Sequence, residues 1–341
     1  MEFRTAGDPV VVLDGGLATE LEAQGHDLGD ALWSARLLAD DPDAVVAAHH
    51  AFFRAGATVA TTASYQASFD GLAARGVGRA EAERLLRRSV ELADVARAEC
   101  AGDGRRRFVA ASVGPYGAAL ADGSEYRGRY GCSVADLAGW HRRRLEVLVD
   151  AGPDVLALET VPDVDEALAL VTAVAGAPVP AWLSYSIRGG RTRAGQPLVD
   201  AFAAVADSAE IVAVGVNCCD PVDVAPALAV ARQVTDKPVL VYPNSGERWD
   251  AGARRWTGPS HFTPAHASAW IAAGAFAVGG CCRVRPSDIA ALAAVAAQNR
   301  VLAPKCDPGA APDRTMSPKC DPGGRPRRCA AGREPPRPSS G

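Results

Sequence analysis

Short apolar segments alternate along this chain with longer segments in which apolar residues recur at helical spacing. The short segments are rich in Val, Ala and Leu, and most of them lead into glycine or a polar residue. This alternation is typical of a parallel sheet covered by helices, because a helix returns the chain to the edge where the next strand begins. It predicts eight strands, over residues 9–13, 58–62, 108–112, 154–158, 181–185, 211–216, 239–242 and 275–278.

Capping residues mark where helices begin and end. Asp41 and Pro42 suit the cap and the first position of a helix that ends at Gly56. A long helix is expected over residues 78–99, and Ser133 with Asp136 has the pattern of a capping box at the start of another. Eight strand–helix units of this kind predict an α/β protein built as a single (β/α)8 TIM barrel.

In such a barrel the chemical groups lie at the C-terminal ends of the strands, because the loops there converge on one mouth. The residues expected at these ends are Asp14, Ser64, Gly114, Glu159, Ser184 or Tyr185, Asn217 with Cys218, Asn244, and Gly280-Cys281-Cys282. The cysteines that follow the sixth and the eighth strand are therefore expected to meet at one rim.

The barrel is expected to occupy residues 1–302, and the composition changes beyond it. Residues 303–341 are rich in Pro, Gly and Arg, lack periodicity and repeat the segment Pro-Lys-Cys-Asp-Pro-Gly. Such a composition buries too little apolar surface to fold, so we predict a disordered tail. Its Cys306, Cys320 and Cys329 are widely spaced without a histidine near them, which disfavours a second metal site.

Composition narrows the class of function. The chain has 341 residues, of which 48% are hydrophobic, a net charge of -4 and an isoelectric point near 5.9. This charge gives no electrostatic reason to expect a nucleic acid or an anionic membrane as partner, so small-molecule substrates are expected. The start has no basic segment followed by an apolar one, and no apolar run reaches membrane-spanning length, which predicts a cytoplasmic protein.

The cysteines are grouped in a way that favours a metal site. Cys281 and Cys282 follow the eighth strand, and Cys218 and Cys219 follow the sixth. Adjacent cysteines bond to each other only through a strained ring, whereas the two preceding glycines let the backbone bend so that both sulfurs converge. Three thiolates with one open position describe a catalytic zinc, since structural zinc sites use four protein ligands. The alternative is that these cysteines are small buried residues that fill space.

Histidines and lysines give little support to other mechanisms. The six histidines stand in helices or polar loops, where solvated or capping roles are expected, and no nucleophile elbow accompanies them. Outside the tail the one lysine is Lys237, which precedes the seventh strand and so belongs to the opposite end of the barrel. This placement disfavours a Schiff-base aldolase.

Several separated motifs resemble those of the homocysteine S-methyltransferase family, in the family's order and over roughly Val10 to Leu302. They are Asp14-Gly15-Gly16, Ser112-Val113-Gly114-Pro115-Tyr116-Gly117, Glu159-Thr160, Gly215-Val216-Asn217-Cys218, Tyr242-Pro243-Asn244-Ser245-Gly246 and Gly279-Gly280-Cys281-Cys282-Arg283. That family is a zinc-dependent barrel, so the resemblance implies Zn2+ as cofactor. It also implies that Cys218, Cys281 and Cys282 are the ligands, with Cys218 preferred over Cys219 because the family's cysteine directly follows the asparagine.

The resemblance further implies how substrates bind. Asp14 and Glu159 are expected to receive the ammonium group of homocysteine, and Asn244 to help shape the pocket. Thr160 stands where the betaine-using branch of the family has an aromatic residue, so the chain is more similar to the branch that uses S-methylmethionine or S-adenosylmethionine. A cationic donor can rest on an aromatic ring. The candidate rings are Tyr65, Tyr116, Tyr126 and Trp33.

Two functions are compatible with these residues. The first is a zinc-dependent methyltransferase that moves a methyl group from a sulfonium donor, or from a betaine-type donor, to the thiol of homocysteine and forms methionine. The second is a non-catalytic zinc- or thiol-binding barrel that acts as a redox sensor. Formation of methionine distinguishes the two, because metal content is the same in both.

Overall fold

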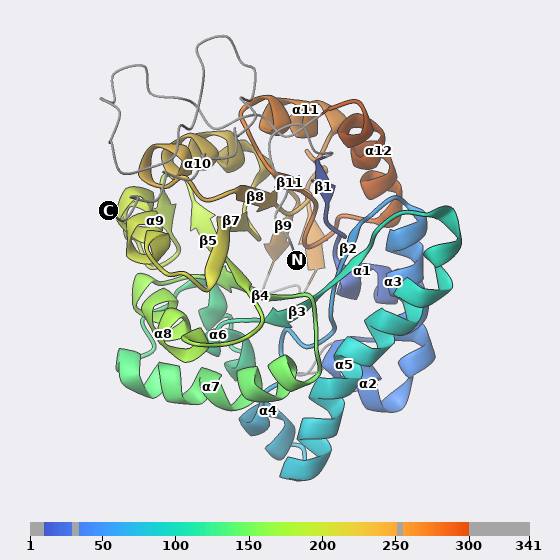
Figure 1. The fold of residues 1–341 in the computed structure, drawn as a ribbon, viewed down its shortest axis with the longest axis vertical. Coiled ribbons are helices and arrows are strands. Elements are labelled where there is room, and N and C mark those ends of the chain that lie inside the picture. The colour runs from blue at the N-terminus through green and yellow to red at the C-terminus, as the bar shows by residue number, and fades with distance from the viewer. Residues whose placement is uncertain (1–9, 29–33, 251–254, 300–341) are drawn as a thin grey trace, which may run out of the picture. The chain divides into compact units, whose positions relative to one another are not determined.

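The eight predicted strands are present and form one parallel barrel (Figure 1). The structure, a computed structural model, describes residues 10–28, 34–250 and 255–299, and the tail predicted from residue 303 onward lies outside them. The barrel strands are β1 (Val11–Val12), β2 (Val59–Thr61), β3 (Phe108–Val113), β4 (Val155–Val161), β5 (Ala181–Arg188), β7 (Ile211–Asn217), β8 (Val239–Tyr242) and β11 (Ala277–Val278).

Hydrogen bonds connect the strands in the order β1-β11-β8-β7-β5-β4-β3-β2. The ring is closed by a single bridge between Leu13, just after β1, and Val59 in β2. All neighbouring barrel strands are parallel, so their C-terminal ends share one mouth. The last strand thus lies beside the first, and loops far apart in sequence meet there.

Helices surround the barrel, and the predicted caps are confirmed. Asp41 accepts a hydrogen bond from the N–H of Ala44, and Ser133 and Asp136 form a capping box. In the described part of the chain no helix is both long enough and apolar enough to cross a membrane. The helices are α1 (Leu17–Ala23), α2 (Ser34–Asp40), α3 (Pro42–Arg54), α4 (Phe69–Ala73), α5 (Arg79–Glu99), α6 (Tyr116–Leu120), α7 (Val134–Asp150), α8 (Val164–Val174), α9 (Leu198–Ala206), α10 (Pro221–Val234), α11 (Pro264–Ala272) and α12 (Pro286–Ala297), with short 3-10 turns η1 (Ala101–Asp103) and η2 (Ser124–Tyr126).

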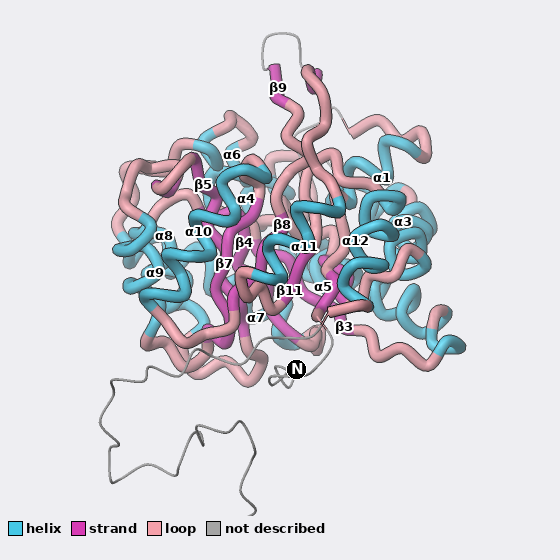
Figure 2. The backbone as a smooth tube through the Cα atoms, turned by 90° about the horizontal axis from the view of Figure 1, so that it is seen from above, coloured by secondary structure: helices cyan, strands magenta, loops and turns pink. Residues whose placement is uncertain are grey.

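Three short strands lie outside the predicted pattern. β6 (Arg191–Thr192) pairs antiparallel with the end of β5, and β9 (Arg248–Asp250) pairs with β10 (Arg255–Thr257) as a separate two-stranded ribbon. Figure 2 shows β9 projecting away from the barrel on the side of the loop that follows β8.

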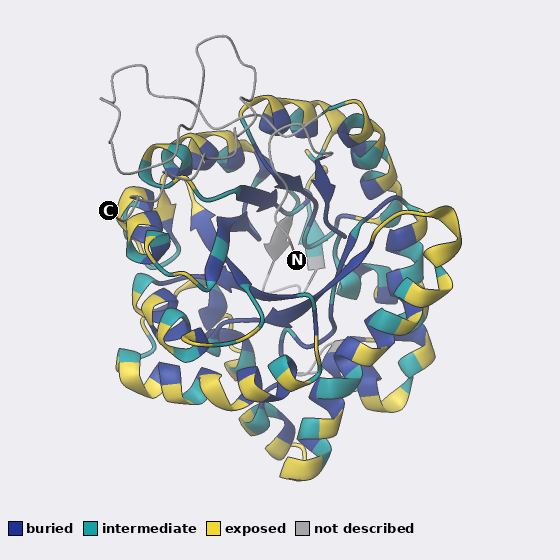
Figure 3. Cartoon of the chain, in the orientation of Figure 1, coloured by how far each residue is buried: buried dark blue, intermediate teal, exposed yellow. Residues whose placement is uncertain are grey.

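The core has two layers, one inside the barrel and one between the strands and the helices. The inner layer contains Phe108, Trp182, Leu240 and Phe276, and the outer layer joins the strand faces to the apolar faces of the helices. Figure 3 shows this division, with dark strands enclosed by helices whose outer faces are exposed. The strands are therefore buried on both faces, as their apolar sequences predict.

The expectation of solvated or capping histidines was wrong at two positions. His49 and His141 are fully buried in α3 and α7. The Nε2 atom of His141 lies 2.9 Å from Oε1 of Glu166, and its Nδ1 lies 2.9 Å from Nη2 of Arg144. Burial lowers the pKa of His141 to about 4, so this ring is neutral, donating to Glu166 and accepting from Arg144.

This buried network holds the loop that follows β3. Glu166 accepts a hydrogen bond from the N–H of Tyr116 at 2.6 Å, and Arg144 donates to the carbonyl oxygen of Gly114. Arg144 also lies over the ring of Trp140, with 4.6 Å from its Cζ to the ring centroid. Helices α7 and α8 thus fix a loop at the mouth through charged groups that never reach solvent.

Gly215 in β7 has no room for a side chain. A Cβ atom at this position would overlap the carbonyl oxygen of Leu240 in the adjacent β8. We expect Gly215→Ala to lower the free energy of unfolding by at least about 2 kcal/mol, because paired backbones must separate. The shift of the urea midpoint measures this effect.

The matched control is Gly139→Ala in α7, where a Cβ atom meets nothing within 4 Å. Alanine favours a helix over glycine, so this variant is expected to gain up to about 1 kcal/mol. Equal effects of the two substitutions would contradict the packing argument.

Candidate functional site

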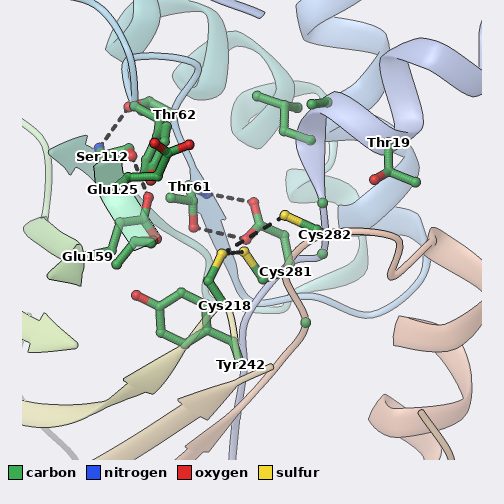
Figure 4. A pocket seen from close by; sticks show the side chains of 18 of the residues that line it. Thr19, Thr61, Thr62, Ser112, Glu125, Glu159, Cys218, Tyr242, Cys281 and Cys282 are labelled. Atoms are coloured by element: carbon green, nitrogen blue, oxygen red, sulfur yellow. Dashed lines mark hydrogen bonds between the residues drawn. The ribbon is translucent and has the colours of Figure 1, made fainter. Parts of the chain in front are cut away.

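A pocket lies at the C-terminal ends of the barrel strands (Figure 4). Its lining contains three carboxyl groups and three thiols, and none of its residues is Lys, Arg or His. The lining residues are Asp14, Gly15, Gly16, Leu17, Ala18, Thr19, Thr61, Thr62, Tyr65, Ser112, Glu125, Tyr126, Glu159, Thr160, Cys218, Tyr242, Gly280, Cys281 and Cys282. A concave site with this charge suits positively charged ligands.

Three cysteine sulfurs meet in the pocket. The Sγ atom of Cys218 lies 2.8 Å from that of Cys281 and 3.9 Å from that of Cys282, as the dashed lines in Figure 4 show. The three sulfurs all lie within 4.8 Å of one another. Among the residues described, this is the one cluster of three or more potential metal ligands.

These sulfurs fit a tetrahedral metal that prefers thiolates. Sulfurs bound at about 2.3 Å to one tetrahedral zinc are roughly 3.8 Å apart, which matches the 3.9 Å between Cys218 and Cys282. The pair at 2.8 Å must open by roughly 1 Å to accept the ion. Hydrogen bonds from Cys218 and Cys281 hold the pKa of Cys282 well below its usual range, so the cluster carries negative charge that a cation stabilises.

Two residues of the pocket, Cys218 and Thr160, have a strained backbone, and the side chain of Asn217 holds the second of them. Cys218 and Thr160 have φ angles of 47° and 61°, in the left-handed region that side chains other than glycine avoid. Asn217 Oδ1 accepts from the N–H of Thr160 at 2.8 Å, and its Nδ2 donates to Thr160 Oγ1 at 2.7 Å. One buried amide, from the residue that precedes Cys218, therefore fixes the turn that follows Glu159.

The glycines before Cys281 have a different role from the one predicted. Neither Gly279 nor Gly280 has a positive φ angle, so neither uses the left-handed conformation that only glycine adopts easily. A Cβ atom at Gly279 would lie 2.5 Å from Cβ of Leu13, and one at Gly280 would overlap the side chain of Val284. Glycine is needed at Gly279 because the chain just after β1 approaches closely, and at Gly280 because the side chain of Val284 packs against the backbone.

Asn244 and Cys219 support the cysteine loops from outside the pocket lining. The Oδ1 atom of Asn244 accepts from the N–H of Cys282 at 3.0 Å, and the N–H of Asn244 donates to the carbonyl oxygen of Cys219 at 2.9 Å. The side chain of Cys219 is buried in the outer layer of the core. The structure thus brings Cys218, and not Cys219, to the other two sulfurs.

Asp14 and Glu159 both line the pocket, as predicted, and are 3% and 7% exposed. The two carboxylate oxygens of Asp14 accept from the N–H of Thr61 at 2.6 Å and from its Oγ1 at 2.9 Å. Ser112 Oγ donates to Oε1 of Glu159. Burial raises the pKa of Asp14 to about 8, with a further contribution from the charge of Glu159, and burial raises the pKa of Glu159 to about 7.

The other predicted contacts are divided between the pocket and the surrounding structure. Tyr65 and Tyr126 line the pocket. Tyr116 instead packs edge-on against Tyr130 and Trp140. Trp33 lies outside the described residues. Nζ of Lys237 donates to the carbonyl oxygens of Ser208 and Ile211, before β7 and at its start, in agreement with its predicted place at the other end of the barrel.

Sequence reasoning missed several lining residues. Thr61 and Ser112 carry hydroxyl groups within predicted strands. Like the carboxylates that they bind, both lie near the C-terminal end of a strand, and this position could have identified them. Tyr242 is the last residue of β8, and its hydroxyl lies 2.5 Å from Oγ of Ser184. Glu125 comes from η2, in a loop without a strand-end position to point to it.

Residues 11–296 match the family model described as Homocysteine S-methyltransferase. The chain belongs to the homocysteine S-methyltransferase family. Relatives in this family include Homocysteine S-methyltransferase YbgG of Bacillus subtilis, 43% identical over 296 residues that cover 84% of this chain and 94% of that protein. Homocysteine S-methyltransferase of Escherichia coli is 44% identical over 297 residues, with coverage of 84% and 94%.

A solved structure of this homocysteine S-methyltransferase family is also similar to the chain. The metallated form of the homocysteine methyltransferase MmuM from Escherichia coli has a TM-score of 0.77 and 44% identity, covering 84% of this chain and 96% of that one. The family resemblance and the barrel predicted from the sequence are therefore confirmed.

Removal of the Asn217 side chain tests the support of the site. We expect Asn217→Ala to lower the free energy of unfolding by about 1–3 kcal/mol, because the N–H and hydroxyl of Thr160 lose their buried partners. The measurement is urea unfolding of the metal-free protein. The control is Gln233→Ala, which removes an exposed amide from α10 and is expected to change stability by less than about 0.5 kcal/mol. If Asn217→Ala lowered the free energy of unfolding no more than the control does, the supporting role assigned to Asn217 would be contradicted.

Proposed function

We propose that this chain is a zinc-dependent methyltransferase that moves a methyl group from a sulfonium donor, S-methylmethionine or S-adenosylmethionine, to homocysteine and forms methionine. The observation that carries the proposal is the meeting of three thiols with acidic side chains in one pocket of a chain that belongs to this family. A redox sensor needs the thiols but gives no reason for buried carboxyl groups beside them.

Cys218, Cys281 and Cys282 are the residues that would hold the zinc ion. An all-sulfur donor set favours zinc over hard cations such as Mg2+ or Ca2+. When bound, zinc supplies the Lewis acidity that lets a substrate thiol lose its proton near neutral pH. Three protein ligands leave one position for that thiol.

Asp14 and Glu159 would bind the ammonium group of homocysteine. Each is fixed by a hydroxyl donor on a neighbouring strand, Thr61 for Asp14 and Ser112 for Glu159, so the carboxylates are oriented before the substrate arrives. Burial makes the charged form of each carboxyl group unfavourable, which raises its pKa. A bound cation stabilises the charged form and so compensates for this effect. Asn244 would act indirectly, by ordering the backbone of Cys282.

The transfer itself needs orientation more than acid–base catalysis. The homocysteine sulfur attacks the donor methyl carbon while the bond from that carbon to the donor sulfur breaks. The electron pair stays on the donor sulfur, which leaves as a neutral thioether, and the thiol proton has already gone to solvent. The protein must hold the methyl group in line with the attacking sulfur, which is the role of the pocket walls.

Substitution of each zinc ligand tests the proposal. The wild-type protein is expected to bind about one zinc per chain, and Cys218→Ser, Cys281→Ser and Cys282→Ser are each expected to lose zinc and at least about 100-fold of methionine formation. Metal analysis and a methyltransferase assay with each donor measure this. Cys132→Ser, which changes an exposed thiol, is the control and should keep both. A folded, zinc-loaded wild-type protein that forms no methionine with any donor would rule out the proposal.

The pKa of Glu159 predicts how homocysteine binding depends on pH. With a pKa of about 7 the carboxyl gains a proton as the pH falls through neutrality, and the neutral form does not attract an ammonium group. We expect KM for homocysteine to rise roughly tenfold from pH 8 to pH 6 from this group alone. Glu159→Gln should show a high KM at every pH and lose that component. The components that belong to Asp14, whose pKa is about 8, and to the substrate thiol remain in both proteins. Identical profiles in the two proteins would contradict the role of Glu159.

A further inference from the structure

Glu125 is a buried carboxyl group in the pocket, and one of its two oxygen atoms has no hydrogen-bonding partner among the described residues. It lies in η2 between β3 and α7, is 8% exposed and lines the pocket. Its Oε2 atom is buried and has no partner within the described part of the protein. A buried acceptor left in this state is unfavourable, so a ligand that supplies the missing partner binds with an advantage.

The other two carboxyl groups of the pocket already have protein partners. Both oxygens of Asp14 accept from Thr61, and Glu159 accepts from Ser112. Glu125 is the remaining acidic side chain of the lining, and no basic side chain of the lining neutralises it. Figure 4 shows it among the side chains that face the same space as the sulfurs.

The backbone of the loop that carries Glu125 is held by close packing and hydrogen bonds. A Cβ atom at Gly117 would overlap the backbone nitrogen of Glu125, which shows how closely α6 packs on η2. The N–H of Ser124 donates to Oδ1 of Asp122 at 2.9 Å, and the N–H of Arg127 donates to the carbonyl oxygen of Ser124 at 2.9 Å. The position of Glu125 is thus set by backbone contacts on both sides.

The ring beside it belongs to the same site. Tyr126 follows Glu125 and also lines the pocket. The guanidinium of Arg193 lies 5.2 Å from the centroid of this ring, and it donates to the carbonyl oxygen of Cys218 at 3.3 Å. Arg193 is not a lining residue, and it contacts the wall of the pocket at the ring of Tyr126 and the carbonyl oxygen of Cys218.

We infer that Glu125 recognises the positive charge of the methyl donor, an onium compound, and so determines donor specificity. The inference rests on the proposed function. Homocysteine brings one positive charge, its ammonium group, which Asp14 and Glu159 would receive. A sulfonium amino acid brings two more positive charges, and Glu125 is the unpartnered acidic group that can receive one of them.

Steady-state kinetics of Glu125→Gln tests this assignment. In the zinc-loaded protein, KM for S-methylmethionine is expected to rise at least about tenfold, because a charge-assisted contact is lost, while KM for homocysteine changes less than about twofold. Glu159→Gln should show the reverse pattern. Glu146→Gln, which removes an exposed charge from α7, is the matched control and should change neither constant. S-adenosylmethionine and betaine are tested in parallel, to show which onium donor depends on Glu125.

Two further measurements keep the outcome clear. The metal-free Glu125→Gln protein is expected to unfold at a temperature no lower than the wild type, because a neutral amide replaces a buried, unpaired carboxyl group. Glu125→Asp, which keeps the charge on a shorter side chain, should have a KM for the donor between those of the other two proteins. An unchanged donor KM, or equal changes in both KM values, would overturn the inference.

Direct binding separates this inference from the proposed function. Calorimetric titration of zinc-loaded protein with S-methylmethionine, in the absence of homocysteine, measures donor binding without turnover. Weaker binding by Glu125→Gln would support the role of Glu125 even if no methyl transfer occurred. Equal binding by the two proteins would overturn it even if the wild type formed methionine.

Discussion

The site depends on the approach of three sulfur atoms, and that approach depends on the parallel pairing of β7, β8 and β11. Cys218 directly follows β7, whereas Cys281 and Cys282 follow β11, and β8 separates these two strands in the sheet. Parallel pairing brings their C-terminal ends to one level, which leaves 2.8 Å and 3.9 Å between Cys218 and the other two sulfurs. The left-handed backbone at Cys218 is the local cost of this geometry. The side-chain amides of Asn217 and Asn244 stabilise the neighbouring backbone at Thr160 and Cys282.

Charge is the second constraint on the mouth of the barrel. Three thiols and three carboxyl groups, all of which become negative when they ionise, lie close together in a buried space whose lining has no basic side chain. Burial makes ionisation of Asp14 and Glu159 unfavourable in the empty pocket, and a cationic metal and cationic substrates reverse that penalty. The pocket therefore becomes more favourable electrostatically as its ligands enter, which couples their binding to one another.

Much of this arrangement was predictable from the sequence. The eight strands were visible because each is a short apolar run between helices with clear caps, and the convergence of the cysteines followed from the parallel barrel. Glu125 was not predictable, because it reaches the pocket from a loop positioned by the close packing at Gly117. His141 was misread because its burial depends on the packing of α7 against α8, which its own helix does not reveal. The two glycines before Cys281 were recognised, but the reason for them is close packing, against the chain just after β1 at Gly279 and against Val284 at Gly280.

The pairing of β1 with β11 also determines when the site is completed during synthesis. Val11 is among the first described residues to leave the ribosome, and its partner Ala277 is among the last. Likewise, the carbonyl oxygen of Asp14 accepts a hydrogen bond from the N–H of Gly280, which is synthesised much later. Such long-range contacts form late, so a nascent chain can bury its middle strands but has neither a closed ring nor a complete set of sulfurs. Insertion of the metal therefore belongs to the last stage of maturation, after most of the polypeptide has been translated.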